Sequence, residues 1–320
     1  MNKTNRIALW TGAAACVAAV GFIGLKTLMD TAIRREIPLR QKQYEENAQR
    51  ARDESPYADA FRDAKAWLEA QNPEEIQIRS FDGLTLKGHL LKSPDAVRTA
   101  VYLHGWRENW NTNLGLVARF LVEHHTNVIL PEQRSHGASE GEYIGFGILE
   151  RRDLQEWADF ASARFPDLPL YLGGVSMGAA TCLMASDLPL PANVRGIVAD
   201  SGYTSPRAIL THYFTSRSIL PEWPVMSLEN QMVKLYAGYR LDECSAIEAL
   251  RHNKKIPVLF FHGDSDKLVP LAMSLENYLA CSAPKELVIV EGAGHGMSYL
   301  VDKETCEDAL LRFFARCDRA

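Results

Sequence analysis

The amino-acid sequence predicts an α/β fold, a three-layer α/β/α sandwich built on a mostly parallel sheet. Short apolar runs rich in Val, Ile, Leu and aromatic residues recur along the chain: TAVYLHG, NVILPE, LYLGGVS, VRGIVAD, PVLFFHG and KELVIV. Runs that are apolar throughout, rather than alternating, are typical of parallel strands covered by helices on both faces. The segments between them are long enough for crossover helices, which we expect over residues 111–125, 150–165, 177–187, 270–281 and 302–316.

An antiparallel hairpin precedes these strands. Apolar residues alternate on both sides of Asp82-Gly83, a pair that tight hairpin turns favour, over residues 76–80 and 84–90. We expect one domain over residues 75–320, because no linker or internal repeat divides it. About fifty residues separate Ser201 from Arg251 before the next strand begins. An insertion of this size predicts a helical cap over residues 201–251.

The N-terminal segment has a different composition. The nineteen residues from Ile7 to Leu25 carry no charge. At about 1.5 Å per residue, a helix of this length roughly matches the ~30 Å hydrocarbon core of a bilayer. We therefore expect a single-pass transmembrane anchor within residues 1–29, in the cell membrane. A cleaved signal peptide with Lys3 and Arg6 in its basic region, and a helix buried in the protein, stay open as alternatives.

Residues 30–74 are rich in Arg, Glu, Gln and Ala, which predicts a helical spacer of one or two helices. Basic residues after the apolar segment outnumber those before it, which favours a cytoplasmic catalytic domain. Large domains cross membranes regardless of such charges, so the side of the membrane stays open.

Charge and cysteine content exclude some classes of partner. The chain carries 35 basic and 40 acidic residues, mixed along its length, for a net charge of −5. No basic stripe tracks a phosphate backbone, so nucleic acid is not an expected partner. The cysteines after the apolar segment show no CxxC spacing, which resembles neither a disulfide framework nor a zinc site. We expect no metal, and the oligomeric state stays open.

Polar residues lie where the predicted strands end. Ligands bind beyond the carboxyl ends of the strands in sheets of this kind, so these residues should meet at one edge. They are His104, Arg134, Ser135, His136, Ser176, Asp200, His262, Asp264, Asp266 and His295.

Ser176 is the candidate nucleophile. It lies in Gly174-Val175-Ser176-Met177-Gly178, a GxSxG pattern, directly after a predicted strand and before a predicted helix. The glycines suit a strained turn in which a side chain would collide with neighbouring backbone. A serine hydroxyl also needs a base, a carboxylate that holds the base, and donors for the oxyanion.

The other parts of such a triad follow in the order Ser, Asp, His. Asp266 follows the PVLFFHG strand and His295 lies in the glycine-flanked GAGHG loop, so we expect Asp266 to orient His295 as the base. Asp264 and Asp200 are the competing acids, and Asp264 is expected to shape the turn.

The expected oxyanion donors are the backbone amides of Met177, at the positive end of a helix, and of Trp106. Trp106 is also expected to touch substrate, and His104 to brace its loop. No cofactor is expected.

Taken together, the hairpin and the motifs YLHGW, PEQRSHGASEG, GGVSMGAA, HGDSDKLVP and GAGHG resemble the α/β-hydrolase superfamily over about residues 75–318. Within it, the chain resembles bacterial membrane-anchored hydrolases of the serine-aminopeptidase-like and Bem46-like group. The resemblance implies the same triad of Ser176, Asp266 and His295. One departure is Ser135, where the family more often has Gly, and we expect this position to be part of the loop architecture.

These motifs predict a cofactor-independent serine hydrolase that acts on a small-molecule or acyl substrate through an acyl-enzyme. The target bond is an ester, thioester or amide, with a carboxylesterase-like activity foremost and a peptidase as a further option. A non-catalytic binding protein of the same fold and an acyltransferase stay open as alternatives.

Overall fold

The computed structural model describes residues 20–37, 41–112 and 114–318. Eight strands form one sheet in the order β1-β2-β4-β3-β5-β6-β7-β8. The first two pairings, β1 with β2 and β2 with β4, are antiparallel, and the others are parallel. The strands are β1 (Glu74–Arg79), β2 (Thr85–Leu91), β3 (Arg98–Leu103), β4 (Thr126–Pro131), β5 (Leu170–Val175), β6 (Val194–Asp200), β7 (Val258–Gly263) and β8 (Lys285–Val290). The predicted mostly parallel sheet with an N-terminal hairpin is confirmed.

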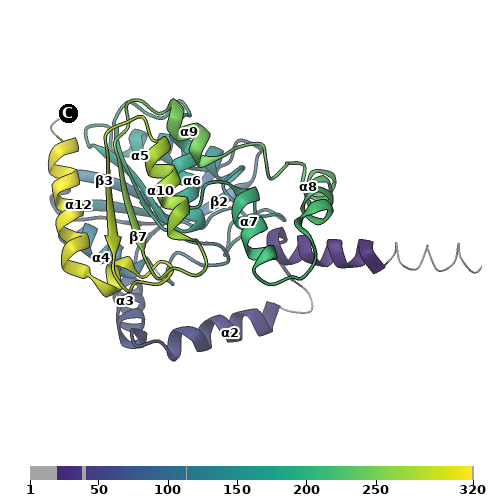
Figure 1. Ribbon diagram of the computed structural model, residues 1–320. Coiled ribbons are helices and arrows are strands. Elements are labelled where there is room, and N and C mark those ends of the chain that lie inside the picture. The colour runs from purple at the N-terminus through teal and green to yellow at the C-terminus, as the bar shows by residue number, and fades with distance from the viewer. Residues whose placement is uncertain (1–19, 38–40, 113, 319–320) are drawn as a thin grey trace, which may run out of the picture.

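Helices cover both faces of this sheet, which gives the predicted three layers (Figure 1). Along β3, Val101 and Leu103 face one hydrophobic cluster while Ala100 and Tyr102 face the other. The first cluster packs under α5 (Glu150–Arg164), α6 (Met177–Ala185), α9 (Ala246–His252) and α10 (Leu271–Ala280). The second packs under α3 (Ala58–Ala70), α4 (Gly115–Glu123) and α12 (Lys303–Cys317), with the short α11 (Ser298–Val301) just before α12.

The hairpin turn has the chemistry that its sequence predicts. Gly83 has a φ of 89°, in the left-handed region that glycine tolerates without a steric penalty. The turn joins Arg79 and Thr85, which pair at the ends of the two strands.

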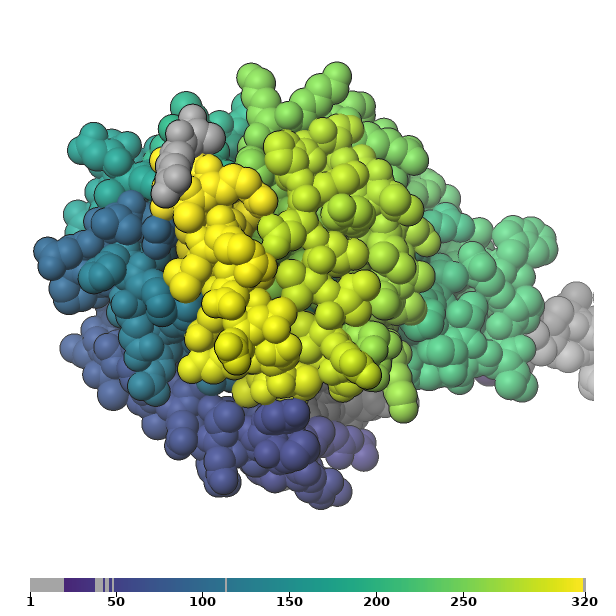
Figure 2. All heavy atoms as spheres, turned by 60° about the vertical axis from the view of Figure 1, so that its left-hand side comes forward, coloured from purple at the N-terminus to yellow at the C-terminus, as the bar shows by residue number. Residues whose placement is uncertain are grey.

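Two helices, α7 (Pro206–Thr215) and α8 (Glu222–Ala237), project at one end of the molecule. Figure 2 shows them as an extension beside the body. Ser205 caps α7 by accepting a 3.1 Å hydrogen bond from the amide of Ala208. Asn230 fastens α8: its amide group donates to Asp242 at 2.9 Å and its carbonyl oxygen accepts from the amide of Leu241 at 2.8 Å.

The N-terminal part of the described chain is a helix over residues 20–33, followed by α2 (Gln41–Asp53) and α3. Met29 and Ile33 have no exposed surface. The amide of Ile144 donates to the carbonyl oxygen of Ile33 at 2.6 Å, and the amide of Arg35 donates to Glu142 at 2.8 Å. Residues 29–35 are therefore built into the body, which the prediction of a spacer from residue 30 did not foresee.

Within the described ranges, no helix is both long enough and apolar enough to cross a bilayer. Most of the predicted anchor, residues 7–19, lies outside the described residues.

Candidate active site

Ser176 stands on the sharp bend between β5 and α6. Its φ of 57° and ψ of −116° lie in a region that non-glycine residues seldom occupy, which raises the side chain above the sheet edge. The amide of Ser176 donates to the carbonyl oxygen of Asp200 on β6 at 2.8 Å, and its own carbonyl oxygen caps the first turn of α6. Backbone hydrogen bonds thus hold the strained residue on both sides.

The two glycines of the GxSxG pattern leave the space that this bend needs. A Cβ at Gly174 would lie 2.5 Å from the carbonyl carbon of Gly178. A Cβ at Gly178 would lie 2.4 Å from the carbonyl oxygen of Leu103 on β3. Real Cβ atoms do not approach backbone so closely, so neither position accepts a side chain without moving a strand or the helix.

The structure brings Ser176, His295 and Asp266 together. The Oγ of Ser176 is 2.8 Å from Nε2 of His295, and Nδ1 of His295 is 2.7 Å from Oδ2 of Asp266. The carboxylate only accepts, so Nδ1 carries the imidazole proton and Nε2 is left to accept from the serine hydroxyl. This is the geometry of a nucleophile, a base and an orienting acid.

Asp266 is held by several donors. Burial by itself would raise its pKa, but hydrogen bonds from His262 and His295 and from backbone outweigh it and hold the pKa well below the usual range. Oδ1 accepts from the amides of Leu268 and Val269 at 2.8 and 2.9 Å. The carboxylate beside His295 is therefore ionised at neutral pH.

His262 is a second imidazole at this carboxylate, and the sequence did not single it out for that role. Its Nε2 donates to the carbonyl oxygen of Val269 at 2.9 Å and lies 3.4 Å from Oδ2 of Asp266. Its Nδ1 is 2.6 Å from the hydroxyl of Ser274 on α10. His262, which is fully buried, therefore braces the loop that carries Asp266.

The two competing carboxylates have other partners. Oδ1 of Asp264 accepts from the amide of Gly292 at 2.8 Å, so Asp264 shapes the loop, as expected. Asp200 accepts from the hydroxyls of Ser201 and Ser298, each at 3.0 Å, and burial raises its pKa. Neither makes a hydrogen bond to His295 in the described part of the chain.

The loop after β3 lies against the serine. A Cβ built on Gly105 would be 3.5 Å from the Cβ of Ser176, which puts the Gly105-Trp106 backbone beside Ser176. His104 is buried, and burial lowers its pKa to about 4, so it is neutral at pH 7. Its Nε2 accepts from the amide of Gln133 at 3.1 Å, and its Nδ1 lies 2.8 Å from the carbonyl oxygen of Gly105. These bonds brace the loop.

The amide of Met177 begins α6 on the other side of Ser176.

A largely apolar pocket of about 100 Å³ opens at Ser176. Trp106 lines it, in the place where a substrate contact is expected, and its indole Nε1 donates to the carbonyl oxygen of Ala32 at 2.9 Å. The walls come from the body, from α7 and α8, which are the helices of the predicted cap, and from the helix over residues 20–33. They are Leu28, Thr31, Ala32, Trp106, Phe146, Ser176, Tyr203, Ile209, Leu210, Tyr213, Phe214, Met226, Glu229, Leu268 and Val269.

Sequence reasoning missed two parts of this wall. It assigned Leu28, Thr31 and Ala32 to an anchor and a spacer, because an apolar run carries no sign of which surface it will meet. It also passed over Glu229, a single acidic residue on a helix, whose burial is visible only once α8 is packed. The amphipathic pattern of α8 was the one signal that placed Glu229 on the same face as Met226 and Val233.

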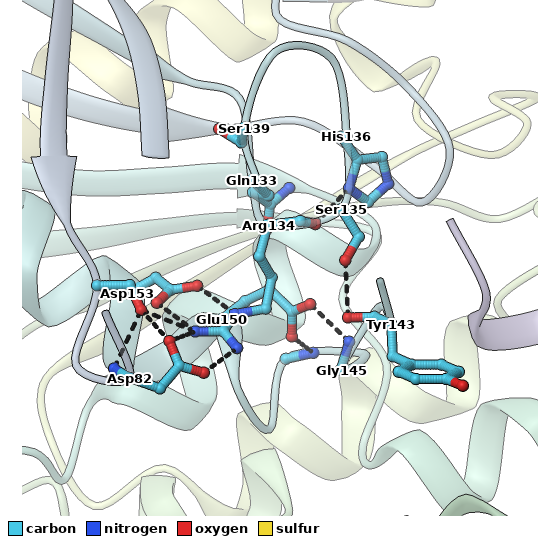
Figure 3. Close-up of polar contacts among 12 residues, drawn as sticks. Asp82, Gln133, Arg134, Ser135, His136, Ser139, Tyr143, Gly145, Glu150 and Asp153 are labelled. Atoms are coloured by element: carbon cyan, nitrogen blue, oxygen red, sulfur yellow. Dashed lines mark hydrogen bonds and ion pairs between the residues drawn. The ribbon is translucent and has the colours of Figure 1, made fainter. Parts of the chain in front are cut away.

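The loop after β4 contains Ser135, where the family more often has Gly. The side chain of Arg134, in the same loop, ties it to the rest of the structure (Figure 3). Nε and Nη2 of Arg134 donate to the carboxylate of Asp153 on α5 at 2.5 and 2.7 Å. Its Nη1 donates to Asp82 in the hairpin turn at 2.9 Å. Ser135 has a φ of 63°, the conformation that favours glycine, and its hydroxyl donates to the carbonyl oxygen of Tyr143 at 2.9 Å. This bond joins the loop to the segment that pairs with residues 33–35.

Comparison with known proteins agrees with this geometry. A model described as the alpha/beta hydrolase family matches residues 100–309, more than half of the chain. The chain therefore belongs to the α/β-hydrolase family.

Relatives and solved structures support the same assignment. The protein YqkD of Bacillus subtilis (strain 168) is 28% identical over 237 residues, 74% of this chain and 77% of YqkD. Protein bem46 of Schizosaccharomyces pombe is 22% identical over 218 residues, 67% of either chain, which supports the Bem46-like branch. The esterase Pf2001 of Pyrococcus furiosus has a TM-score of 0.64 at 23% identity, over 78% of this chain and 93% of that one. At this identity the likeness is one of fold.

Proposed function

We propose that the protein is a serine hydrolase that cleaves carboxylic esters through an acyl-enzyme intermediate. The observation that carries the proposal is the 2.8 Å contact between Oγ of Ser176 and Nε2 of His295. His295 takes the hydroxyl proton as Oγ attacks the carbonyl carbon, and the amides of Met177 and Trp106 stabilise the oxyanion. The protonated imidazole then gives its proton to the departing alkoxide, and water, activated by the same base, releases the acid.

The apolar pocket favours an ester with an apolar acyl chain, and the structural neighbour Pf2001 is itself an esterase. Thioester or amide cleavage would use the same acyl-enzyme, and an acyltransferase would differ only in the acceptor of the second step. A binding protein without turnover has no need for all three side chains in this geometry, which argues against that alternative.

We further propose that the protein is tethered to the cell membrane by its N-terminal apolar segment. Support comes from the cap, because its free end carries exposed apolar side chains next to the helix over residues 20–33, which has its own. Lys26 lies 4.8 Å from the ring centroid of Tyr236, so this helix and α8 are neighbours. Exposed apolar side chains of this kind suit contact with lipid. They are Val20, Phe22, Ile23, Ile219, Leu220, Trp223 and Leu228.

Labelling by a fluorophosphonate probe tests the chemistry. The wild-type protein should be labelled and should hydrolyse p-nitrophenyl esters, whereas Ser176→Ala should lose labelling and lose turnover by a factor on the order of 10⁴ or more. Ser216→Ala removes an exposed hydroxyl of the cap and should change neither. Equal labelling of the wild type and Ser176→Ala would refute the nucleophile.

Carbonate extraction tests the tether. The full chain should stay with the membrane pellet and keep its N-terminal peptide in mass spectrometry. A soluble protein that lacks this peptide would instead establish a cleaved signal.

A further inference from the structure

Glu229 is a buried carboxyl group in the pocket beside the nucleophile. It comes from cap helix α8 and is 2% exposed. Among the residues that line this pocket within the described ranges, it is the one with an ionisable carboxyl. Two hydroxyl groups of the wall are satisfied internally: that of Thr31 donates to the carbonyl oxygen of Thr27 at 2.7 Å, and that of Tyr203 donates to the carbonyl oxygen of Phe146 at 3.0 Å.

No contact in the described structure explains why this carboxyl is buried. Oε2 of Glu229 is buried without a hydrogen-bond partner among the described residues. The adjacent Asn230 makes a contrast, because both ends of its amide are bonded to the loop that follows α8. A buried polar group without a hydrogen-bond partner lowers stability, so the carboxyl of Glu229 does not hold the cap in place.

The surroundings of Glu229 decide its charge. Burial, and then the nearby carboxylate of Asp30, raise its pKa to about 8. Asp30 itself pairs with Lys26 at 2.6 Å, so that ammonium group is already engaged. At neutral pH Glu229 is mostly protonated and offers one O–H donor and one acceptor oxygen. A hydroxyl group, which both donates and accepts, is the matching partner, whereas an ammonium group would need the ionised form.

We propose that Glu229 is a specificity-determining residue that binds a hydroxyl group on the acyl chain of the substrate. The proposal rests on the serine hydrolase function above. The acyl part is favoured because it stays bonded to Ser176, which lines the pocket, while the leaving group must reach His295, which does not line it. The substrate class is therefore an ester of a hydroxylated, otherwise apolar carboxylic acid.

Two matched series of p-nitrophenyl esters of increasing chain length test this, one ending in a methyl group and one in a hydroxyl group. At the length that reaches Glu229, wild-type kcat/KM should favour the hydroxyl form about tenfold, which corresponds to about 1.4 kcal/mol. Glu229→Met should lose this preference and gain activity on the methyl form. Glu222→Met, the same change at an exposed position of α8, should retain it.

The outcomes separate the two proposals. Failure of the wild type to react with the fluorophosphonate probe would refute the hydrolase itself. Labelling and ester turnover without a hydroxyl preference at any length, or a preference that survives in Glu229→Met, would refute the role of Glu229 alone. A preference for amine-terminated esters would likewise overturn it, by replacing the hydroxyl with an ammonium group.

Thermal unfolding separates a role of Glu229 in specificity from a role in stability, because the two predict opposite changes in Tm for Glu229→Met. Glu229→Met removes a buried polar group that has no hydrogen-bond partner, so the Tm of this variant should equal or exceed that of the wild type. A lower Tm would mean that the carboxyl holds the cap, which contradicts the proposal.

Discussion

The indole Nε1 of Trp106 donates a 2.9 Å hydrogen bond to the carbonyl oxygen of Ala32. The bond joins the loop beside Ser176 to a helix that comes more than seventy residues earlier in the chain. Arg107 strengthens this junction, since its Nη2 donates to the carbonyl oxygens of Thr31 and Arg34 at 3.0 and 2.6 Å. The N-terminal helix is therefore fastened to the body that carries Ser176.

Two isoleucines on this helix make a matched test. Ile33 is fully buried whereas Ile23 is 62% exposed. Ile33→Ala should lower the free energy of unfolding by about 2–5 kcal/mol, because it leaves a cavity in the packed core. Ile23→Ala should change it by less than about 0.5 kcal/mol. Urea denaturation measures both, and equal losses would mean that the helix does not pack as described.

The hydrogen bond between Asp266 and His295 predicts which carboxylate matters for turnover. Asp266→Asn should lower kcat on p-nitrophenyl esters by a factor on the order of 10⁴, because the amide favours the wrong imidazole tautomer. Asp200→Asn keeps a group that can pair with Ser201 and Ser298, so turnover should stay within about tenfold. The reverse ranking would identify Asp200, rather than Asp266, as the carboxylate that orients His295.

The crowding around Ser176 predicts a sharp difference between two glycines. Gly178→Ala forces a Cβ against the carbonyl oxygen of Leu103 and should cost about 1–3 kcal/mol or more, with loss of turnover. Gly21→Ala meets nothing within 4 Å and lies in a helix, so it should stabilise slightly, by about 0.5–1 kcal/mol. Denaturation with a parallel ester assay would check both, and a fully active Gly178→Ala protein would contradict the geometry.

The raised pKa of Glu229 predicts a pH dependence of stability. Its pKa is 4.5 in the unfolded reference and about 8 in the folded protein. Between these values the unfolded chain releases a proton that the folded chain keeps, so stability falls as the pH rises. Relative to Glu229→Gln, the wild type should lose up to about 1.4 kcal/mol per pH unit within this window and nothing below it. Parallel stability curves for the two proteins would show that the carboxyl titrates normally.

Local patterns were enough to predict the sheet and to select the three side chains that meet at its edge. Apolar runs, the Asp82-Gly83 turn and the order of Ser176, Asp266 and His295 all depend on neighbours in sequence or on the shared edge of a parallel sheet. The rest depends on packing between distant segments. The sequence does not show that His262 will share a carboxylate with His295, or that residues 28–32 will meet the cap, because those contacts arise only when the layers are assembled.

The family match begins at residue 100, while one wall of the pocket comes from residues 28–32. Residues 28–32 therefore shape the space in front of Ser176 although they lie outside the matched region. Grafting residues 20–37 from a relative would reshape the space in front of Ser176 while leaving every strand in place. Changes confined to residues 28–32 can therefore alter the shape of the pocket without any change at the edge of the sheet that carries Ser176.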